Sequence, residues 1–92
     1  MFLVNNRKKD VAMEKITDEQ RRKASIAAGL RSHRAMKKES QREFAKKIGS
    51  TASTVSAWET SGGISAADAW AAADHYGISI DELLGRKNLR II

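Results

Sequence analysis

Apolar side chains recur every three or four residues along most of the chain, and strand-like alternation is almost absent. Near the middle of the second half, for example, Ala69, Trp70, Ala73 and Tyr76 share that spacing. Side chains three or four residues apart lie on one face of a helix, where they are buried together. The pattern therefore predicts helices over residues 18–37, 41–48, 52–59, 66–76 and 80–84.

Helix start and stop signals divide the chain at the same places. A Ser or Thr with an acid or amide three residues later forms a capping box, which satisfies two free N–H groups at a helix start. Four such pairs occur: Thr17 with Gln20, Ser40 with Glu43, Ser65 with Asp68, and Ser79 with Glu82. Thr51 is a plain N-cap without the acid. Glycines that can end a helix stand at Gly49, Gly62, Gly63, Gly77 and Gly85. These signals predict an all-α domain over residues 17–85, between tails at 1–16 and 86–92.

The predicted helices share one set of apolar positions that would form a core. Trp58 and Trp70 could instead stack on nucleic-acid bases, but their helical spacing with other apolar residues favours the core. The alanines around Trp70 are consistent with small residues that make room for one large ring. The expected core residues are Ile26, Ala27, Leu30, Phe44, Ala45, Ile48, Val55, Trp58, Ala66, Ala69, Trp70, Ala73, Tyr76, Ile80, Leu83 and Leu84.

The composition excludes several classes of protein. The 92 residues contain no Cys and no Pro, and there is no run of about 18 apolar residues, so a disulfide framework, a Cys-based metal site and a membrane span are excluded. Apolar residues precede the first basic cluster, the reverse of a secretory signal, so a cytoplasmic, nucleoid-associated protein is expected. His33 and His75 have no partner at metal-ligand spacing, so no metal and no cofactor are expected.

The charge is unevenly distributed. Residues 1–47 carry 14 Lys or Arg and 6 Asp or Glu, whereas residues 48–92 carry 3 and 5. A basic half indicates a polyanionic partner, most often nucleic acid, although solvated helix surface explains the charge equally well.

Residues 41–60 have the pattern of a helix-turn-helix unit. Ala45 is small where two helices would cross closely, and Gly49 would end the first helix. Val55 and Trp58 would point inward from the second helix and fix the angle between the pair. Its first turns would then face outward, where they could enter the major groove of DNA.

The stretch from Leu30 to Leu84 resembles the lambda-repressor-like (Cro/cI-type, XRE-like) helix-turn-helix family. The resemblance is carried by Arg34, by "SQREFAKKIGSTASTVSAWE" at residues 40–59, and by "ADHYGISIDELLG" at residues 73–85. It implies a compact five-helix DNA-binding domain whose helix-turn-helix is formed by the second and third helices. It also implies a homodimer that binds double-stranded DNA at a near-palindromic operator.

The resemblance also implies roles for single residues. A glutamine at the position of Gln41 grips a DNA phosphate, and residues like Arg34 and Glu59 form a salt bridge beside the DNA backbone, from which Arg34 could also reach a phosphate. The expected phosphate contacts are Arg34, Lys38, Gln41, Arg42 and Thr60. The expected structural residues of the motif are Ala45, Gly49, Val55, Trp58 and Glu59.

The expected base contacts are unusual because none has a long polar side chain. Hydroxyls discriminate bases weakly, and alanine methyls contribute only a small preference for thymine. We therefore expect close approach, bridging waters and DNA shape to contribute more of the specificity than usual. The alternative is that this helix no longer reads DNA. The residues are Thr51, Ala52, Ser53, Ser56 and Ala57.

Other positions depart from the family pattern or lie outside the motif. His33 and Glu39 stand where the family prefers leucine-like residues, which predicts looser packing of the first helix, or a shifted helix with Met36 in the gap. Residues 5–9 are either an arm that reaches around DNA or a tail, and residues 1–12 are incidental if Met13 is the biological start. Leu89, Ile91 and Ile92 are expected to pack on the last helix or at a dimer interface.

The sequence thus predicts a sequence-specific DNA-binding transcriptional regulator, a repressor that works as a homodimer. The alternative is a protein-interaction module on the same scaffold, such as an antitoxin or adaptor with weak DNA binding. No arrangement of nucleophile, base or metal ligands supports an enzyme. Neither a small-molecule ligand nor a membrane partner is indicated.

Overall fold

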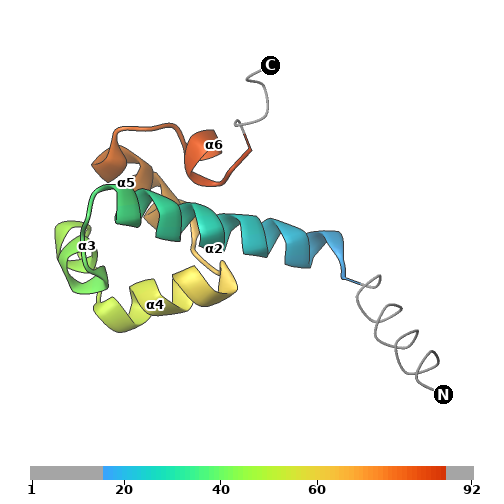
Figure 1. Ribbon diagram of the computed structural model, residues 1–92, viewed down its shortest axis with the longest axis horizontal. Coiled ribbons are helices and arrows are strands. Elements are labelled where there is room, and N and C mark those ends of the chain that lie inside the picture. The colour runs from blue at the N-terminus through green and yellow to red at the C-terminus, as the bar shows by residue number, and fades with distance from the viewer. Residues whose placement is uncertain (1–15, 87–92) are drawn as a thin grey trace.

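The computed structural model describes residues 16–86, and every regular element in that part of the chain is an α-helix (Figure 1). The helices are α2 (Asp18–Met36), α3 (Gln41–Lys47), α4 (Ala52–Ser61), α5 (Ala66–Tyr76) and α6 (Ile80–Leu83). Each bound lies within two residues of its prediction, and the all-α fold class is confirmed. Residues 5–9, predicted to form either an arm or a tail, lie outside the described residues, as do Leu89, Ile91 and Ile92.

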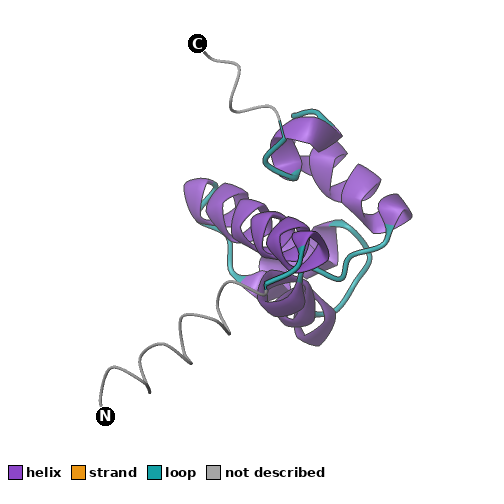
Figure 2. Cartoon of the chain, turned by 90° about the vertical axis from the view of Figure 1, so that its right-hand side faces the viewer, coloured by secondary structure: helices purple, strands orange, loops and turns teal. Residues whose placement is uncertain are grey.

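The long helix α2 crosses the middle of the molecule, with α4 on one side and α5 and α6 on the other (Figures 1 and 2). α2 packs against both α4 and α6, and α3 packs against α4. The side chains that these helices bury meet in one core: Leu30, Phe44, Ala45, Val55, Trp58, Ala69, Ala72, Ala73, Tyr76 and Leu83. Burial of this apolar area is the main term that stabilises so small a domain.

The predicted helix caps are present, with one correction. At Thr17, Ser40 and Ser79 the side-chain oxygen accepts a hydrogen bond from the backbone N–H three residues later, and the reciprocal bond completes the capping box. The pair at Ser65 is only half a box. Ser65 accepts from the N–H of Asp68, but the Asp68 carboxylate accepts from the Ser65 hydroxyl at 3.0 Å instead of from its backbone N–H.

The core prediction is wrong at three positions, of which Trp70 is the most important. Trp70 is 65% exposed and Ile80 is 36% exposed, and Ala66 also lies at the surface. The reason for Trp70 is its angle on the helix. α5 buries the face that contains Ala69, Ala72, Ala73 and Tyr76, and each residue advances about 100° around a helix. The four buried residues span about 100° of the helix, and Trp70 lies about 60° beyond Ala73, which is at the edge of that face.

Of the two alternatives for the first helix, the one that places Met36 in the gap is wrong, and Glu39 and His33 both have partners. His75 Nε2 lies 2.8 Å from the Glu39 carboxylate, and both side chains are largely buried. The His33 ring lies 5.9 Å from the ring of Tyr76. Polar and aromatic contacts thus fill the space that leucine-like residues would occupy, and Met36 does not enter it, since it is 73% exposed.

Candidate DNA-binding surface

A turn of four residues, 48–51, reverses the chain between α3 and α4. Gly49 adopts φ 73°, and the N–H of Ser50 reaches back to the carbonyl of Ala45 at 2.8 Å. Thr51 then caps α4 by accepting from the N–H of Thr54 at 3.1 Å. Ala45 and Val55 are buried on either side of this turn, so the two helices are held at a fixed angle.

The N-terminal half of α4 presents a face of small side chains. Thr51, Ser53 and Ala57 are exposed, and Ala52 and Ser56 are partly exposed. Several neighbouring hydroxyls are used within the helix, since Thr51 bonds Thr54 and Thr60 donates to the Ser56 carbonyl at 2.9 Å. The hydroxyls of Ser53 and Ser56 have no intramolecular partner among the described residues, so they are the ones available to an external ligand.

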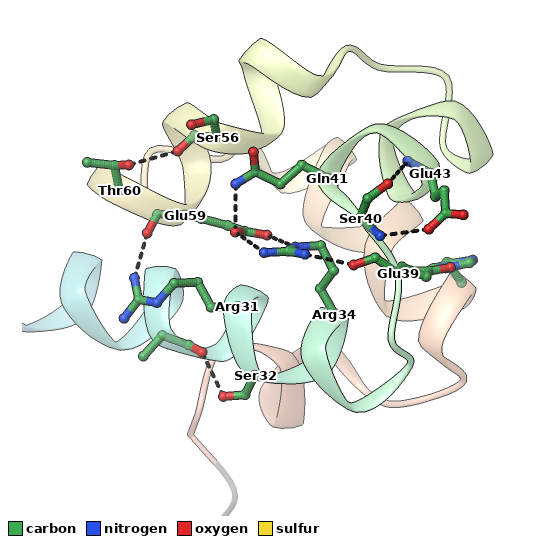
Figure 3. A network of polar contacts seen from close by, with 12 residues as sticks. Arg31, Ser32, Arg34, Glu39, Ser40, Gln41, Glu43, Ser56, Glu59 and Thr60 are labelled. Atoms are coloured by element: carbon green, nitrogen blue, oxygen red, sulfur yellow. Dashed lines mark hydrogen bonds and ion pairs between the residues drawn. The ribbon is translucent and has the colours of Figure 1, made fainter.

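Behind this face, one buried carboxylate ties three helices together (Figure 3). Glu59 of α4 is only 4% exposed. Its two oxygens accept from Arg34 Nε at 2.7 Å and Arg34 Nη2 at 3.0 Å, and Oε1 also accepts from Gln41 Nε2 at 3.0 Å. Arg31 donates to the Glu59 backbone carbonyl at 2.6 Å. The arrangement fixes α2, α3 and α4 relative to one another.

The pKa of Glu59 reflects two opposing effects. Burial favours the protonated carboxyl and acts to raise the pKa, but the hydrogen bonds from Arg34 and Gln41 and the positive charge of Arg34 outweigh it. The net result is a pKa below the usual value, so Glu59 is ionised at neutral pH. The same hydrogen bond raises the pKa of Arg34. This is a structural ion pair and not the solvent-exposed pair that the sequence also allowed.

The residues predicted to contact phosphate fall into two groups. Lys38, Arg42 and Thr60 are exposed and directed to solvent. Arg34 is mostly buried, and its Nη1 donates to the Glu39 carbonyl at 2.7 Å in addition to the two bonds to Glu59. Gln41 is partly buried and has one amide hydrogen bond to Glu59. Arg34 and Gln41 therefore have a positioning role within the domain, whatever they contact outside it.

Among the described residues up to 85, the Lys and Arg side chains come from α2, α3 and the turn between them. Residues 48–85 contain no Lys or Arg, so α4, α5 and α6 are without positive side chains of these two types. Lys37, Lys38 and Arg42 are exposed around the start of α3, the helix that precedes α4 in the helix-turn-helix. The domain thus combines a neutral, closely approachable helix with positive side chains around the start of α3.

Lys38 is the only non-glycine residue with positive φ in the described part of the chain, at 57°. We expect Lys38→Gly to raise the free energy of unfolding by about 1 kcal/mol, since a left-handed backbone costs a residue with a Cβ roughly that amount. It should also weaken DNA binding at all sequences and lower the salt slope by about 1 per subunit. Urea unfolding and titrations at several salt concentrations measure both effects.

Lys37→Ala is the matched control for this substitution, because it removes a neighbouring charge from a right-handed position, at φ −86°. It should weaken DNA binding without stabilising the domain. A Lys38→Gly variant that is less stable than wild type would contradict the prediction.

Three contacts of this region are not evident from the sequence. They are the Glu39–His75 pair, the bond from Arg31 to the Glu59 carbonyl, and the bond from Ser25 Oγ to the Leu84 carbonyl at 2.8 Å. Only Arg31 has a usable signal, because it lies three residues before Arg34 and so on the same helix face. The others join segments far apart in the chain, which spacing alone does not reveal.

Comparison with known proteins agrees with this geometry. No curated protein and no solved structure matches the chain. None of the described helices is long and apolar enough to cross a membrane. A helix-turn-helix family model matches residues 30–83, more than half of the chain, and covers the end of α2 through α6. The chain therefore belongs to the Cro/cI-type, XRE-like helix-turn-helix family of DNA-binding regulators.

Proposed function

We propose that this protein is a sequence-specific transcriptional repressor that occupies a near-palindromic operator as a homodimer. The observation that carries the proposal is the outward face of α4, held in place by the buried Glu59 cluster, in a domain that also exposes basic residues around the start of α3. A rigidly held helix can enter the major groove of DNA, while positive side chains nearby contact the phosphates that flank the groove. Repression then follows from occupying promoter DNA.

In this proposal the phosphate contacts set the position of the domain on DNA. Gln41 uses one amide N–H for Glu59, which fixes its side chain and leaves the other N–H for a phosphate oxygen. Lys38 and Arg42 add positive charge on the same side. The Thr60 hydroxyl donates to the Ser56 carbonyl, so a phosphate contact from Thr60 would require it to exchange that partner for the phosphate. Arg34 acts mainly by orienting Glu59, and through it Gln41.

The base contacts come from short side chains. The hydroxyls of Ser53 and Ser56 can each donate or accept, and the methyls of Ala52 and Ala57 suit a thymine methyl. Since none of these makes a bidentate contact, each base pair contributes less discrimination than an Arg–guanine pair, which is worth about 1–3 kcal/mol. The missing discrimination comes from close approach of the α4 backbone, bridging waters and DNA shape.

The same neutral face also favours a second candidate, a protein-interaction module with little DNA binding. The test that separates the two uses the purified protein and random genomic fragments, retained at low and at moderate salt and then sequenced. A regulator enriches a dyad whose half-sites lie about one DNA turn apart, and its affinity falls steeply with salt, by about 10³-fold or more between 50 and 200 mM. No retention even at low salt would favour the interaction module.

Two substitutions separate the positioning contacts from the specifying ones. We expect Gln41→Ala to weaken binding to all sequences alike, by roughly tenfold, as loss of a charge-assisted contact does. Ser53→Ala should leave binding to random DNA unchanged and alter the base preference at one operator position. Competition titrations against a library of operator variants measure both effects. Equal loss on every sequence for both variants would contradict the assignment.

A further inference from the structure

α5 carries a stripe of side chains that no part of the described domain covers. Trp70 is 65% exposed, the most exposed aromatic side chain among the described residues. Ala66 and Ala67 lie one turn before it and Asp74 one turn after it, and all three are exposed. These four residues, here called the Trp70 stripe, lie next to the buried face of α5 and are open to solvent. An exposed Trp among small residues is typical of a protein-binding site, since Trp is the residue most enriched at binding hot spots.

The charge of the Trp70 stripe argues against nucleic acid as its ligand. Its only ionisable residue is Asp74, and α5 contains no Lys or Arg. His75, the one basic side chain of the helix, is turned inward to Glu39 at 2.8 Å. In a chain with net charge +6, this face would repel a phosphate backbone and suits a protein surface.

We propose that the Trp70 stripe binds the same stripe of a second copy of this chain, with two α5 helices antiparallel across a two-fold axis at Trp70. A two-fold contact must be self-complementary, and the stripe meets that condition. Trp70 would pack on Trp70 at the axis, and the alanines would let the helices approach closely. This inference rests on the homodimer of the proposed function and assigns its surface.

The spacing along α5 would bring Asp74 of one copy near the N-terminus of α5 in the other copy, where the helix dipole is positive. Asp74 lies four residues after Trp70 and Ala66 four residues before it, about 6 Å in each direction. An antiparallel pair therefore places Asp74 of one copy at the start of α5 of the other. Ser65 already accepts from the N–H of Asp68, but the N–H groups of Ala66 and Ala67 lack intrahelical acceptors, and a carboxylate near them is stabilising. A parallel arrangement would instead bring the two Asp74 carboxylates together.

The position of the stripe is compatible with DNA binding. In Figure 1 α4 lies below α2, whereas α5 lies behind and partly above the C-terminal end of α2, so a second copy bound at the Trp70 stripe would leave the small face of α4 open. The contact is small, since a Trp side chain buries about 150–250 Å², whereas stable complexes bury more than about 1,200 Å² in all. The free dimer should therefore be weak, and two half-sites on one DNA molecule should strengthen it through cooperative binding.

Sedimentation equilibrium of the full chain without DNA, over a wide concentration range, measures this contact. We expect Trp70→Ala to raise the dimer dissociation constant at least tenfold, the loss typical of a central hot-spot residue. Asp74→Lys should raise it by about three- to tenfold, because it puts a positive charge at the partner's helix start. Met36→Ala is the matched control, since Met36 is also highly exposed but lies on α2, and it should leave the constant unchanged. Both positions on α5 are exposed, so all variants should melt like wild type.

Titrations on full-site and half-site DNA separate this inference from the proposed function. Trp70→Ala should remove cooperativity on the full site and leave half-site affinity within about twofold. Wild-type protein that stays monomeric at all concentrations and binds full sites without cooperativity would overturn the inference, and so would a dimer indifferent to Trp70→Ala. The first outcome would also remove the homodimer from the proposed function and leave DNA binding by single domains, whereas the second would leave the homodimer and reject only this surface. A dimer that depends on Trp70 but retains no DNA at low salt would support the stripe and reject the repressor.

Discussion

Glu59→Ala should lower the free energy of unfolding by about 3–5 kcal/mol, the loss expected when one partner of a buried ion pair is removed. The substitution leaves Arg34 mostly buried with no carboxylate, and it removes the acceptor of Gln41. The substitution also removes the ion pair that connects α4 to α2, and no other described ion pair connects these helices. A domain of this size has only about 5–15 kcal/mol of stability in all, so much of the variant should be unfolded at 37 °C.

Urea unfolding followed by circular dichroism measures the loss, with Glu19→Ala as the matched control. Glu19 pairs with Lys23 at 3.3 Å, but both side chains are at least half exposed, so its removal should cost less than about 0.5 kcal/mol. Equal losses for the two variants would show that the Glu59 carboxylate is not a structural element. Glu59→Gln should fall between wild type and Glu59→Ala, since the amide keeps one acceptor oxygen.

The same carboxylate should contribute to acid sensitivity, and the sign follows from its lowered pKa. A group whose folded-state pKa is depressed stabilises the protein above its unfolded pKa, about 4.3 for Glu. That contribution is lost as the pH falls through the folded-state pKa. Wild-type stability should thus decrease below about pH 4.5, and Glu59→Gln should flatten that decrease. A parallel pH profile for wild type and Glu59→Gln would contradict the assignment.

Local signals predict the helices well because each depends on residues close in sequence. Ser40 and Glu43 are three residues apart, and their capping box forms with contacts of 2.8 and 3.0 Å regardless of the rest of the fold. Gly49 likewise ends its helix with a local left-handed turn. Such signals are reliable because the two partners are always near each other, in the unfolded chain as well.

Helix-face assignments are less reliable, since they depend on what the rest of the molecule covers. Trp70 has apolar neighbours three or four residues away on both sides. Periodicity alone therefore does not show where around the helix the buried face ends. The alanines of α5 are small enough to be buried or exposed at little cost, and the helix turns Ala72 inward and Trp70 outward. An alanine-rich helix thus has a weakly determined orientation in sequence analysis.

The sequence pattern predicts which residues belong to the candidate site, but it does not predict the hydrogen bonds between them. The resemblance implies that Arg34 and Glu59 pair, and the two form hydrogen bonds of 2.7 and 3.0 Å. The burial of that pair, and its link to Gln41, depend on three helices meeting at one point. Glu39 shows the same difficulty, because its place in the pattern indicates a misfit, whereas the fold brings His75, 36 residues later, beside it.

Gly62→Ala should be the second strongly destabilising substitution, by about 3–4 kcal/mol, because two costs add. Gly62 ends α4 at φ 74°, which any residue with a Cβ adopts at a cost. A Cβ there would also overlap the backbone carbonyl of Lys23 in α2 and lie 2.8 Å from its Cα. Backbone atoms cannot rotate away as a side chain can, so α4 would have to move off α2.

Gly49→Ala isolates the first of these costs, since Gly49 has nearly the same φ, 73°, but no atom lies within 4 Å of the place that its Cβ would occupy. Its expected loss is about 1 kcal/mol. The difference between the two variants in urea unfolding therefore measures the close approach of α4 to α2. The displacement in Gly62→Ala should also lengthen the bond from Arg31 to the Glu59 carbonyl, now 2.6 Å, and so weaken DNA binding more than Gly49→Ala does at equal folded protein. Equal losses of stability would mean that the close contact between Gly62 and α2 does not contribute, and that the Glu59 cluster alone fixes the position of α4.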